Sequence, residues 1–310
     1  MSWAPMSSKP IQAHVSEQRD APRARPAPAP WRDWLGVVPF FLFAFLFIVL
    51  PSVYLLIGAF RNSAGAFTLK NFADLFTPAI LDAYWVTIRI SAVTALAGGL
   101  LGFMMAYAVT VGGLPNGVRT ILSTFSGVAA NMGGVVLAFM FISLIGRQGL
   151  ATKMMKWAGW DLYSGTFDLY KVPGLVTVYT YFQIPLMVLV TLPAIDGLKT
   201  SWREASANLG GTTFTYWRRV GLPVLAPSML GGFLLLFANA YSAFATAYAL
   251  NTQSNLVPIK ISFFLQGDVT GRSPVPFALA TWMIMFMAVS MGGYLVLRKR
   301  AERWQQSAAA

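Results

Sequence analysis

Ser201–Pro223 reads SWREASANLGGTTFTYWRRVGLP and is the longest polar interval between apolar segments that keeps the pattern of well-formed helices. Ser201 and Glu204 give the pattern S-x-x-E, which predicts a capping box, because each side chain can satisfy an unpaired backbone N–H at a helix start. Gly210 and Gly211 predict the end of that helix, since glycine readily adopts the left-handed conformation that closes a helix.

The remainder of this stretch predicts a second short helix. Thr212 or Thr213 is expected to cap it, and Pro223 then starts a long apolar segment, where the missing N–H of proline costs least. The pattern is therefore helix, Gly-Gly elbow, helix and return to an apolar environment.

Trp202, Ala205 and Leu209 recur at helical spacing and share one face of the first helix. Two interpretations are open for this face. It can dock into a groove of another protein, or it can lie on a lipid surface as an amphipathic helix.

The composition indicates a polytopic membrane protein. The 310 residues are 56% hydrophobic and 11% charged, whereas soluble domains carry about 25% charged residues. The chain has no cysteine, which excludes disulfide scaffolds, thiolate metal sites and cysteine nucleophiles. The net charge of +12 is better explained by basic residues at cytoplasmic membrane edges than by nucleic acid. The single histidine, His14, lies in a polar tail and is expected to be solvated.

The hydrophobic pattern predicts an all-α polytopic membrane protein with six transmembrane helices and a polar helical segment between spans four and five. Residues 1–33 are expected to form a disordered, basic cytoplasmic arm, residues 34–300 the transmembrane domain, and residues 301–310 a cytoplasmic tail. The six expected spans are Trp34–Phe60, Tyr84–Val111, Ile121–Ile145, Gly174–Leu192, Leu222–Leu250 and Phe277–Leu297.

Basic residues predict the orientation. With six spans, both termini share one side of the membrane with Ser201–Pro223, and most of the 23 Lys and Arg residues fall on that side. The positive-inside rule therefore places both termini and this stretch in the cytoplasm. The interval Gly146–Pro173 is expected outside the membrane, with Leu150–Trp157 as a short interfacial helix.

Several polar residues inside the expected spans are candidates for a substrate pathway. The glycine-rich run Ser126–Gly134 is expected to bend or unwind, and broken helices at membrane depth often line a cavity. An interhelical hydrogen bond is the alternative role for Asn131. Arg89 either has a functional role as a charge within the membrane or extends its side chain to the membrane surface. The candidate pathway residues are Asn131, Tyr179, Gln183, Asn239 and Tyr241.

No catalytic or metal-binding constellation is present in the sequence. All 11 Asp and Glu residues fall in tails, loops or span ends, and no G-x-x-x-x-G-K-[ST] phosphate loop occurs. The chain is therefore not expected to be an enzyme, a proton-coupled pump or an ATPase.

The motif residues resemble a known family. Glu204-Ala205-Ser206, Gly210 and Leu222-Pro223 are similar to the EAA loop of permease subunits of binding-protein-dependent ABC importers, although Ser206 replaces an alanine and Gly211 stands where alanine is common. In that family the loop is a coupling helix that sits in a cleft of the ATPase. The resemblance implies that Glu204 caps the helix and pairs with the ATPase, and that Gly210 allows the turn. The coupling residues so implied are Trp202, Glu204, Ala205, Ser206, Leu209, Gly210, Phe214, Leu222 and Pro223.

The resemblance also implies partners, location and substrate. The expected assembly contains a cytoplasmic ATPase dimer carrying ATP and Mg, a second permease subunit that is expected to be a different chain, and an extracytoplasmic binding protein, in a bacterial inner membrane. No cofactor is expected on this chain. LAFMFISLIGRQGL and ANLGGTTFTYWRRVGLPVL are similar to the spermidine/putrescine branch, so a polyamine is the favoured substrate. Aminoalkylphosphonate, ferric iron, thiamine and sulfate are alternatives, and a stand-alone secondary transporter or channel is a rival class.

Overall fold

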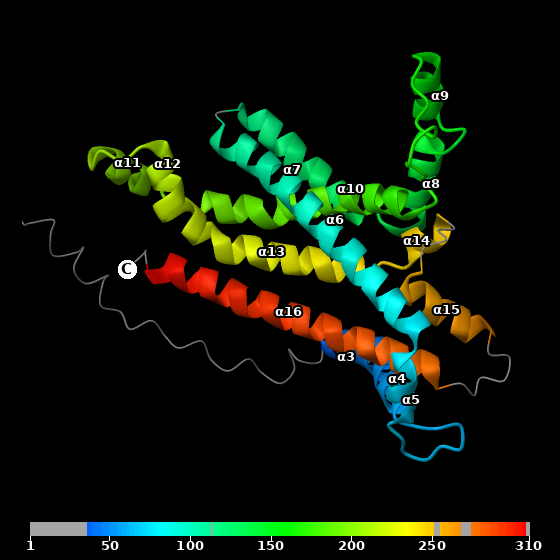
Figure 1. The fold of residues 1–310 in the computed structure, drawn as a ribbon. Helices are drawn as coiled ribbons and strands as arrows, with labels where there is room; N and C mark the ends of the chain where they lie inside the picture. The colour runs from blue at the N-terminus through cyan, green and yellow to red at the C-terminus, as the bar shows by residue number, and fades with distance from the viewer. Residues whose placement is uncertain (1–35, 113, 251–254, 268–273, 308–310) are drawn as a thin grey trace, which may run out of the picture. The chain divides into compact units, whose positions relative to one another are not determined.

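The computed structural model describes residues 36–112, 114–250, 255–267 and 274–307, which fold almost entirely as helices (Figure 1). The expected N-terminal arm, residues 1–33, lies outside the described residues. The chain divides into two units, residues 1–54 and residues 55–310, which are described separately. Among the described residues six helical stretches are long and apolar enough to cross a membrane, which agrees with the number expected from the sequence.

The first unit contains most of the first candidate span, Val38–Ala59. The helix continues past Pro51 because it contains a wider, π-helical turn before the proline. The order is α3 (Val38–Ala44), a π-helical turn η1 (Phe45–Val49) and α4 (Leu50–Ala59), which continues into the second unit. In η1 the N–H of Leu50 donates to the carbonyl of Phe45, five residues earlier. Because the proline ring would clash with the carbonyl four residues before it, a wider turn just ahead of Pro51 lets the helix continue.

The second unit is built around four long helices that pack against one another (Figure 1). Their mutual contacts are the most extensive in the structure, between α10 and α6 and between α13 and α16. Two of the four begin at a proline near the first turn, a position where the missing N–H would have no partner in the helix. These helices are α6 (Pro78–Val111), α10 (Val172–Asp196), α13 (Leu222–Ser242) and α16 (Val275–Ser307).

Small residues on α6 allow the close packing expected for Gly98, Gly99 and Gly102. A Cβ at Gly98 would lie 2.3 Å from the Cβ of Gln183, and one at Gly102 would lie 2.5 Å from the carbonyl oxygen of Ile184. No side chain fits at these distances, so glycine sets the separation between α6 and α10.

The expected third span is broken. Helix α7 (Asn116–Asn131) ends at Met132, Gly134 adopts φ +70°, and α8 (Gly134–Ile145) begins there. The bend expected at this glycine-rich run is therefore present. Alone, α7 and α8 are each shorter than the ~30 Å bilayer core at 1.5 Å per residue.

The location of the third span differs from the expected Ile121–Ile145. The stretch with the length and hydropathy of a span is Gly134–Trp157, which joins α8 to α9 (Leu150–Trp157) through a turn at Gly146–Gly149. The short helix expected at Leu150–Trp157 is present as α9.

The fifth span is also shifted. The expected Leu222–Leu250 becomes Thr213–Ser242, because the helix starts earlier and ends at Ala243, whose backbone is extended. The carbonyl of Ala243 accepts a 2.7 Å hydrogen bond from Tyr179, which holds the chain at this point. A separate short helix, α14 (Ala245–Ala249), follows.

The short helices lie at opposite ends of the four-helix bundle (Figure 1). Helices α11 (Thr200–Asn208) and α12 (Thr213–Tyr216) lie at one end, and α9, α14 and α15 (Val257–Gly267) lie at the other. The segment before α6 adds α5 (Lys70–Ala73) and the 3₁₀ turn η2 (Asp74–Phe76). Helices α11 and α12 are thus separated from α9 by the length of the bundle.

Candidate functional site

The start of α11 differs from the sequence expectation. The N-cap is Lys199, which makes no side-chain capping bond, and Ser201 is the second residue of the helix. The first turn is closed by the backbone, because the carbonyl of Lys199 accepts the N–H of Trp202 at 3.1 Å. The capping box of Ser201 and Glu204 was therefore a wrong prediction, since the helix begins two residues too early for Ser201 to cap it. Glu204 is exposed and does not cap α11.

The end of α11 is the predicted glycine elbow. Gly210 has φ +77°, its N–H donates to Ala207 at 2.9 Å, and the N–H of Gly211 donates to Ser206 at 2.8 Å. These two bonds form a Schellman motif. A Cβ at Gly211 would lie 2.7 Å from the carbonyl oxygen of Ser206, so the second glycine is needed for close approach of the backbone.

Thr212 caps the second helix, one of the two residues expected to do so. Its Oγ1 accepts the N–H of Thr215 at 3.3 Å. However, α12 is not a separate helix. It continues through the π-helical turn η3 (Trp217–Gly221) directly into α13, so Pro223 lies within a continuous helix instead of starting one. As at Pro51, the wider turn precedes the proline, and the N–H of Leu222 donates to the carbonyl of Trp217.

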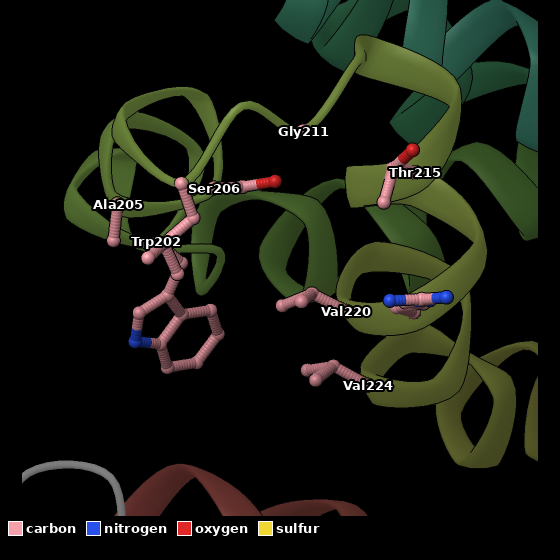
Figure 2. Close-up of a pocket in the computed structure, with 9 residues that line it drawn as sticks. Trp202, Ala205, Ser206, Gly211, Thr215, Val220 and Val224 are labelled. Atoms are coloured by element: carbon pink, nitrogen blue, oxygen red, sulfur yellow. The ribbon is translucent and has the colours of Figure 1, made fainter.

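An apolar groove of about 480 Å³ lies between α11 and the helix that follows it (Figure 2). Four of the nine predicted coupling residues line it: Trp202, Ala205, Ser206 and Leu209. We call this cavity the coupling groove. The other five residues that line the groove are Gly211, Thr215, Arg219, Val220 and Val224.

The other predicted coupling residues do not line the groove. Glu204, Phe214, Leu222 and Pro223 are exposed, and Gly210 acts through its backbone. Thr215, Arg219 and Val224 were missed from the sequence. Their spacing of four and then five residues matches one face of a helix that contains a single π turn, so the signal is visible only once η3 is known.

Near one end of the bundle, Arg119 at the start of α7 pairs with Asp196 at the end of α10. Both side chains are partly exposed, at 41% and 39%, so the pair contributes at most about 1 kcal/mol. Among the residues that the structure describes, no group of three or more His, Cys, Asp or Glu side chains could hold a metal ion.

Three candidate pathway residues are buried within the helix bundle. Tyr179 donates to the carbonyl of Ala243 at 2.7 Å, and the side-chain N–H of Gln183 donates to the carbonyl of Leu236 at 2.8 Å. Both bonds join α10 to the chain of α13 or its end. Tyr241 is fully buried and packs against Phe286 with ring centroids 5.1 Å apart. These side chains are therefore engaged in helix packing in this conformation.

The two asparagines lie on exposed surfaces. The side-chain N–H of Asn131 donates to the carbonyl of Gly127 at 2.8 Å, within its own helix, so the interhelical bond weighed from the sequence is absent among the described contacts. Asn239 is exposed on α13. Since three candidates are buried and two are exposed, the five do not form one surface.

The chain has sequence relatives among transport proteins, although no protein-family model matches it. It is 24% identical over 260 residues to the sulfate transport system permease protein CysW of Escherichia coli, covering 83% of this chain and 85% of the relative. It is also 24% identical over 268 residues to the spermidine/putrescine transport system permease protein PotB of the same species, covering 83% and 93%.

Solved structures share the fold. A bacterial ABC transporter that imports the acidic polysaccharide alginate matches with a TM-score of 0.63 and 16% identity, over 94% of this chain and 99% of that one. The MetNI methionine ABC transporter, in an inward-facing conformation, matches with a TM-score of 0.51 and 15% identity, over 71% and 94%. The chain is thus a homologue of ABC-transporter permease subunits and has the fold of the transmembrane subunits of ABC importers.

Proposed function

We propose that this chain is a permease subunit of an ATP-driven importer, and that α11 and the coupling groove receive the motion of a separate ATPase. The observation that carries the proposal is the continuous helix from Thr213 to Ser242. Because no flexible loop separates α12 from α13, a displacement of α11 passes through the capped start of α12 into the span. A rigid connection is what a permease driven by a partner needs.

The proposal assigns the other activities to other chains. ATP and Mg would bind the cytoplasmic ATPase pair, and an extracytoplasmic binding protein would deliver the substrate. A second permease subunit, which we propose is a different chain, would complete the pathway. The location would be a bacterial inner membrane, with both termini in the cytoplasm, as the distribution of basic residues favours.

The test is the ATPase activity of the reconstituted complex with and without loaded binding protein. Leu209 is 89% exposed at the coupling groove, so Leu209→Ala should reduce the stimulated activity by about tenfold if it is a central contact. Leu114 is a matched control, an exposed leucine in the turn between α6 and α7, and Leu114→Ala should leave stimulation unchanged. Equal activity of both variants would contradict the coupling role of α11.

The substrate is a polyamine in the expectation from the sequence, and sulfate is a second candidate. Aromatic rings can hold an amine by cation–π contact, but the candidate pathway tyrosines Tyr179 and Tyr241 are buried in helix packing. Arg89 is instead exposed on α6, with its guanidinium 4.5 Å from the ring centre of Trp85. An exposed cation within a span is costly where it faces lipid. If Arg89 faces the transport pathway instead, its positive charge favours an anionic substrate.

Two loaded binding proteins separate these candidates. Stimulation by a spermidine-loaded protein alone would support the polyamine, and stimulation by a sulfate-loaded protein alone would support the anion. Arg89→Gln should lower sulfate transport and leave spermidine transport unchanged if Arg89 faces the pathway. Equal loss of both would mean that Arg89 serves folding.

A further inference from the structure

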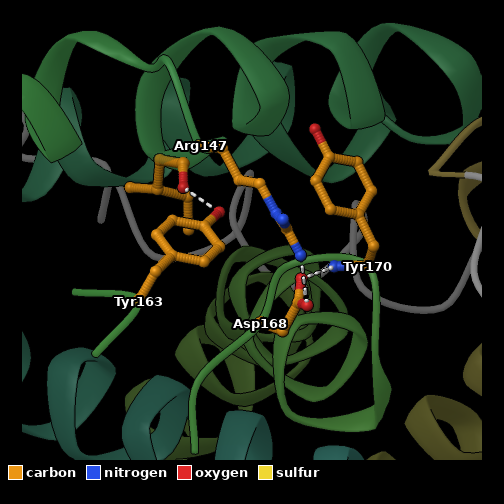
Figure 3. Close-up of polar contacts among 5 residues, drawn as sticks. Arg147, Tyr163, Asp168 and Tyr170 are labelled. Atoms are coloured by element: carbon orange, nitrogen blue, oxygen red, sulfur yellow. Dashed lines mark hydrogen bonds and ion pairs between the residues drawn. The ribbon is translucent and has the colours of Figure 1, made fainter. Parts of the chain in front are cut away.

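The segment between α8 and α10 forms a second pocket, far from the coupling groove. It occupies about 410 Å³ between α9 and the loop that returns to α10. The loop is held in place by Tyr163, whose hydroxyl donates to the carbonyl of Ile145 at 2.7 Å (Figure 3). We call this cavity the α9 pocket. The residues that matter below are Arg147, Thr152, Lys156, Asp161, Asp168 and Lys171.

One arginine of the α9 pocket is already paired. Arg147 contacts the carboxylate of Asp168 at 3.0 Å (Figure 3). The backbone N–H of Tyr170, together with Arg147 and Lys171, lowers the pKa of Asp168 below its ordinary value, against an opposing effect of burial. Asp168 therefore stays ionised at neutral pH and holds Arg147 at the wall of the pocket.

The charge that remains in the α9 pocket is positive. Three cations and two carboxylates line it, and the second carboxylate, Asp161, accepts the backbone N–H of Tyr163 at 3.0 Å. Lys156 and Lys171 have no ion pair within the described part of the chain. Because cations outnumber carboxylates around the cavity, its net charge favours an anionic ligand.

A buried hydroxyl in the same cavity also lacks a partner. Thr152 is only 4% exposed, lines the α9 pocket, and its Oγ1 makes no hydrogen bond to any residue that the structure describes. Leaving a buried hydroxyl unpaired costs about 1–3 kcal/mol, so such groups usually have a ligand or water. An oxyanion bound in the α9 pocket would accept a hydrogen bond from this hydroxyl.

The outer face of α9 is apolar and aromatic. Leu150, Met154 and Trp157 follow one another along one side of the helix and are 64%, 63% and 93% exposed, and Trp160 beyond the helix is 74% exposed. The helix is the end of the candidate span Gly134–Trp157, where the charges Lys153 and Lys156 begin. Tryptophan with lysine at a span end is typical of the boundary between acyl chains and headgroups.

We propose that the α9 pocket binds the phosphate group of an anionic phospholipid, in the membrane leaflet at the end of the bundle opposite α11. Lys156, Lys171 and the Thr152 hydroxyl hold the phosphate, and the apolar face of α9 contacts the acyl chains. The exposed tryptophans beside the pocket favour a lipid over a free ion, although both share the same oxyanion chemistry. This proposal does not depend on the proposed transport function.

The test measures lipid binding to the purified full-length chain in detergent, by native mass spectrometry with phosphatidylglycerol and phosphatidylcholine. The double variant Lys156→Gln/Lys171→Gln should weaken phosphatidylglycerol binding by about tenfold or more and leave phosphatidylcholine unchanged. The double variant Lys70→Gln/Lys260→Gln is the matched control. It removes two charges at the same end of the bundle but outside the pocket. Its effect should be less than about threefold.

A second variant removes the hydroxyl without removing charge. Thr152→Val keeps the shape of the side chain, so it should fold with equal or higher thermal stability while binding phosphatidylglycerol more weakly. Equal phosphatidylglycerol affinity in the pocket and control doubles would overturn the proposal. Displacement of the lipid by millimolar inorganic phosphate or sulfate would assign the site to a free ion and overturn the lipid source. Unchanged lipid binding with weaker docking of a purified binding protein would make the pocket a protein interface, which also overturns it.

Discussion

Single residues define the two ends of α11 and the start of α12, and they do so unequally. The polar pattern of the sequence correctly indicated Thr212 as a cap but wrongly assigned the same role to Ser201. Capping depends on which residue first leaves helical geometry, and that residue is Lys199, whose backbone is extended at ψ 130°. No sequence rule distinguishes Ser201 from Thr212, because both are followed by suitable helix-forming residues.

The two hydroxyls give a matched pair of substitutions. Thr212→Ala should destabilise the start of α12 by about 1 kcal/mol, because the N–H of Thr215 loses its acceptor. Ser201→Ala should change stability by less than about 0.5 kcal/mol, since Ser201 makes no capping bond. Hydrogen exchange of the amides between residues 200 and 221 measures both. A larger loss for Ser201→Ala would restore the capping box.

The left-handed turn at Gly210 is a second feature of single residues that can be tested. No atom lies within 4 Å of a Cβ built at Gly210, so Gly210→Ala meets only the cost of its φ of +77°. That cost is about 1–2 kcal/mol and should loosen the end of α11. Gly127 is the control, since a Cβ there also meets nothing within 4 Å and its φ is not positive. Gly127→Ala should be neutral or stabilising by up to about 1 kcal/mol. Faster exchange at residues 205–212 in the Gly210 variant alone is the expected result.

At the scale of helices, the sequence predicted which segments are helical better than where they join. Apolar runs indicated six spans, but the π turns at Phe45–Val49 and Trp217–Gly221 carry no signal that separates them from ordinary helix. Each ends two residues before a proline, so a proline within a continuous apolar run predicts either a break or a widened turn. The choice depends on packing, and at Pro223 the widened turn joins α12 to α13.

Helix packing gives a sharp prediction at Gly98. Gly98→Ala puts a methyl group 2.3 Å from the Cβ of Gln183 and 3.1 Å from the carbonyl of Thr180, and backbone on both helices must move. The expected destabilisation is about 1–3 kcal/mol or more. Gly292→Ala is the control, a helical glycine on α16 with no atom within 4 Å of its Cβ, and it should not destabilise. Thermal unfolding in detergent compares the two. Equal unfolding temperatures would mean that α6 and α10 pack less closely than described.

At the scale of the whole molecule, length and composition were enough to predict a polytopic helical membrane protein. The candidate site was predicted only in part. Trp202, Ala205, Ser206 and Leu209 line the coupling groove, whereas the pathway residues are divided between the bundle interior and exposed faces. A pathway formed between subunits has no hydrophobic signature in one chain, so polar residues within spans cannot be separated into packing and transport roles from sequence. Charge distribution acts over the whole chain and predicts orientation instead.

The absence of cysteine from the 310 residues makes orientation directly measurable, because one introduced thiol is the only target for a maleimide. Ser164 is exposed in the loop after α9, and Ser201 is exposed at the start of α11, with the candidate span Val172–Asp196 between them. A membrane-impermeant maleimide should label Ser164→Cys in intact spheroplasts and Ser201→Cys only in inside-out vesicles. The reverse pattern would invert the orientation and place the coupling groove away from any cytoplasmic ATPase. Labelling of both from one side would mean that α10 does not cross the membrane, because a single span must separate the two positions.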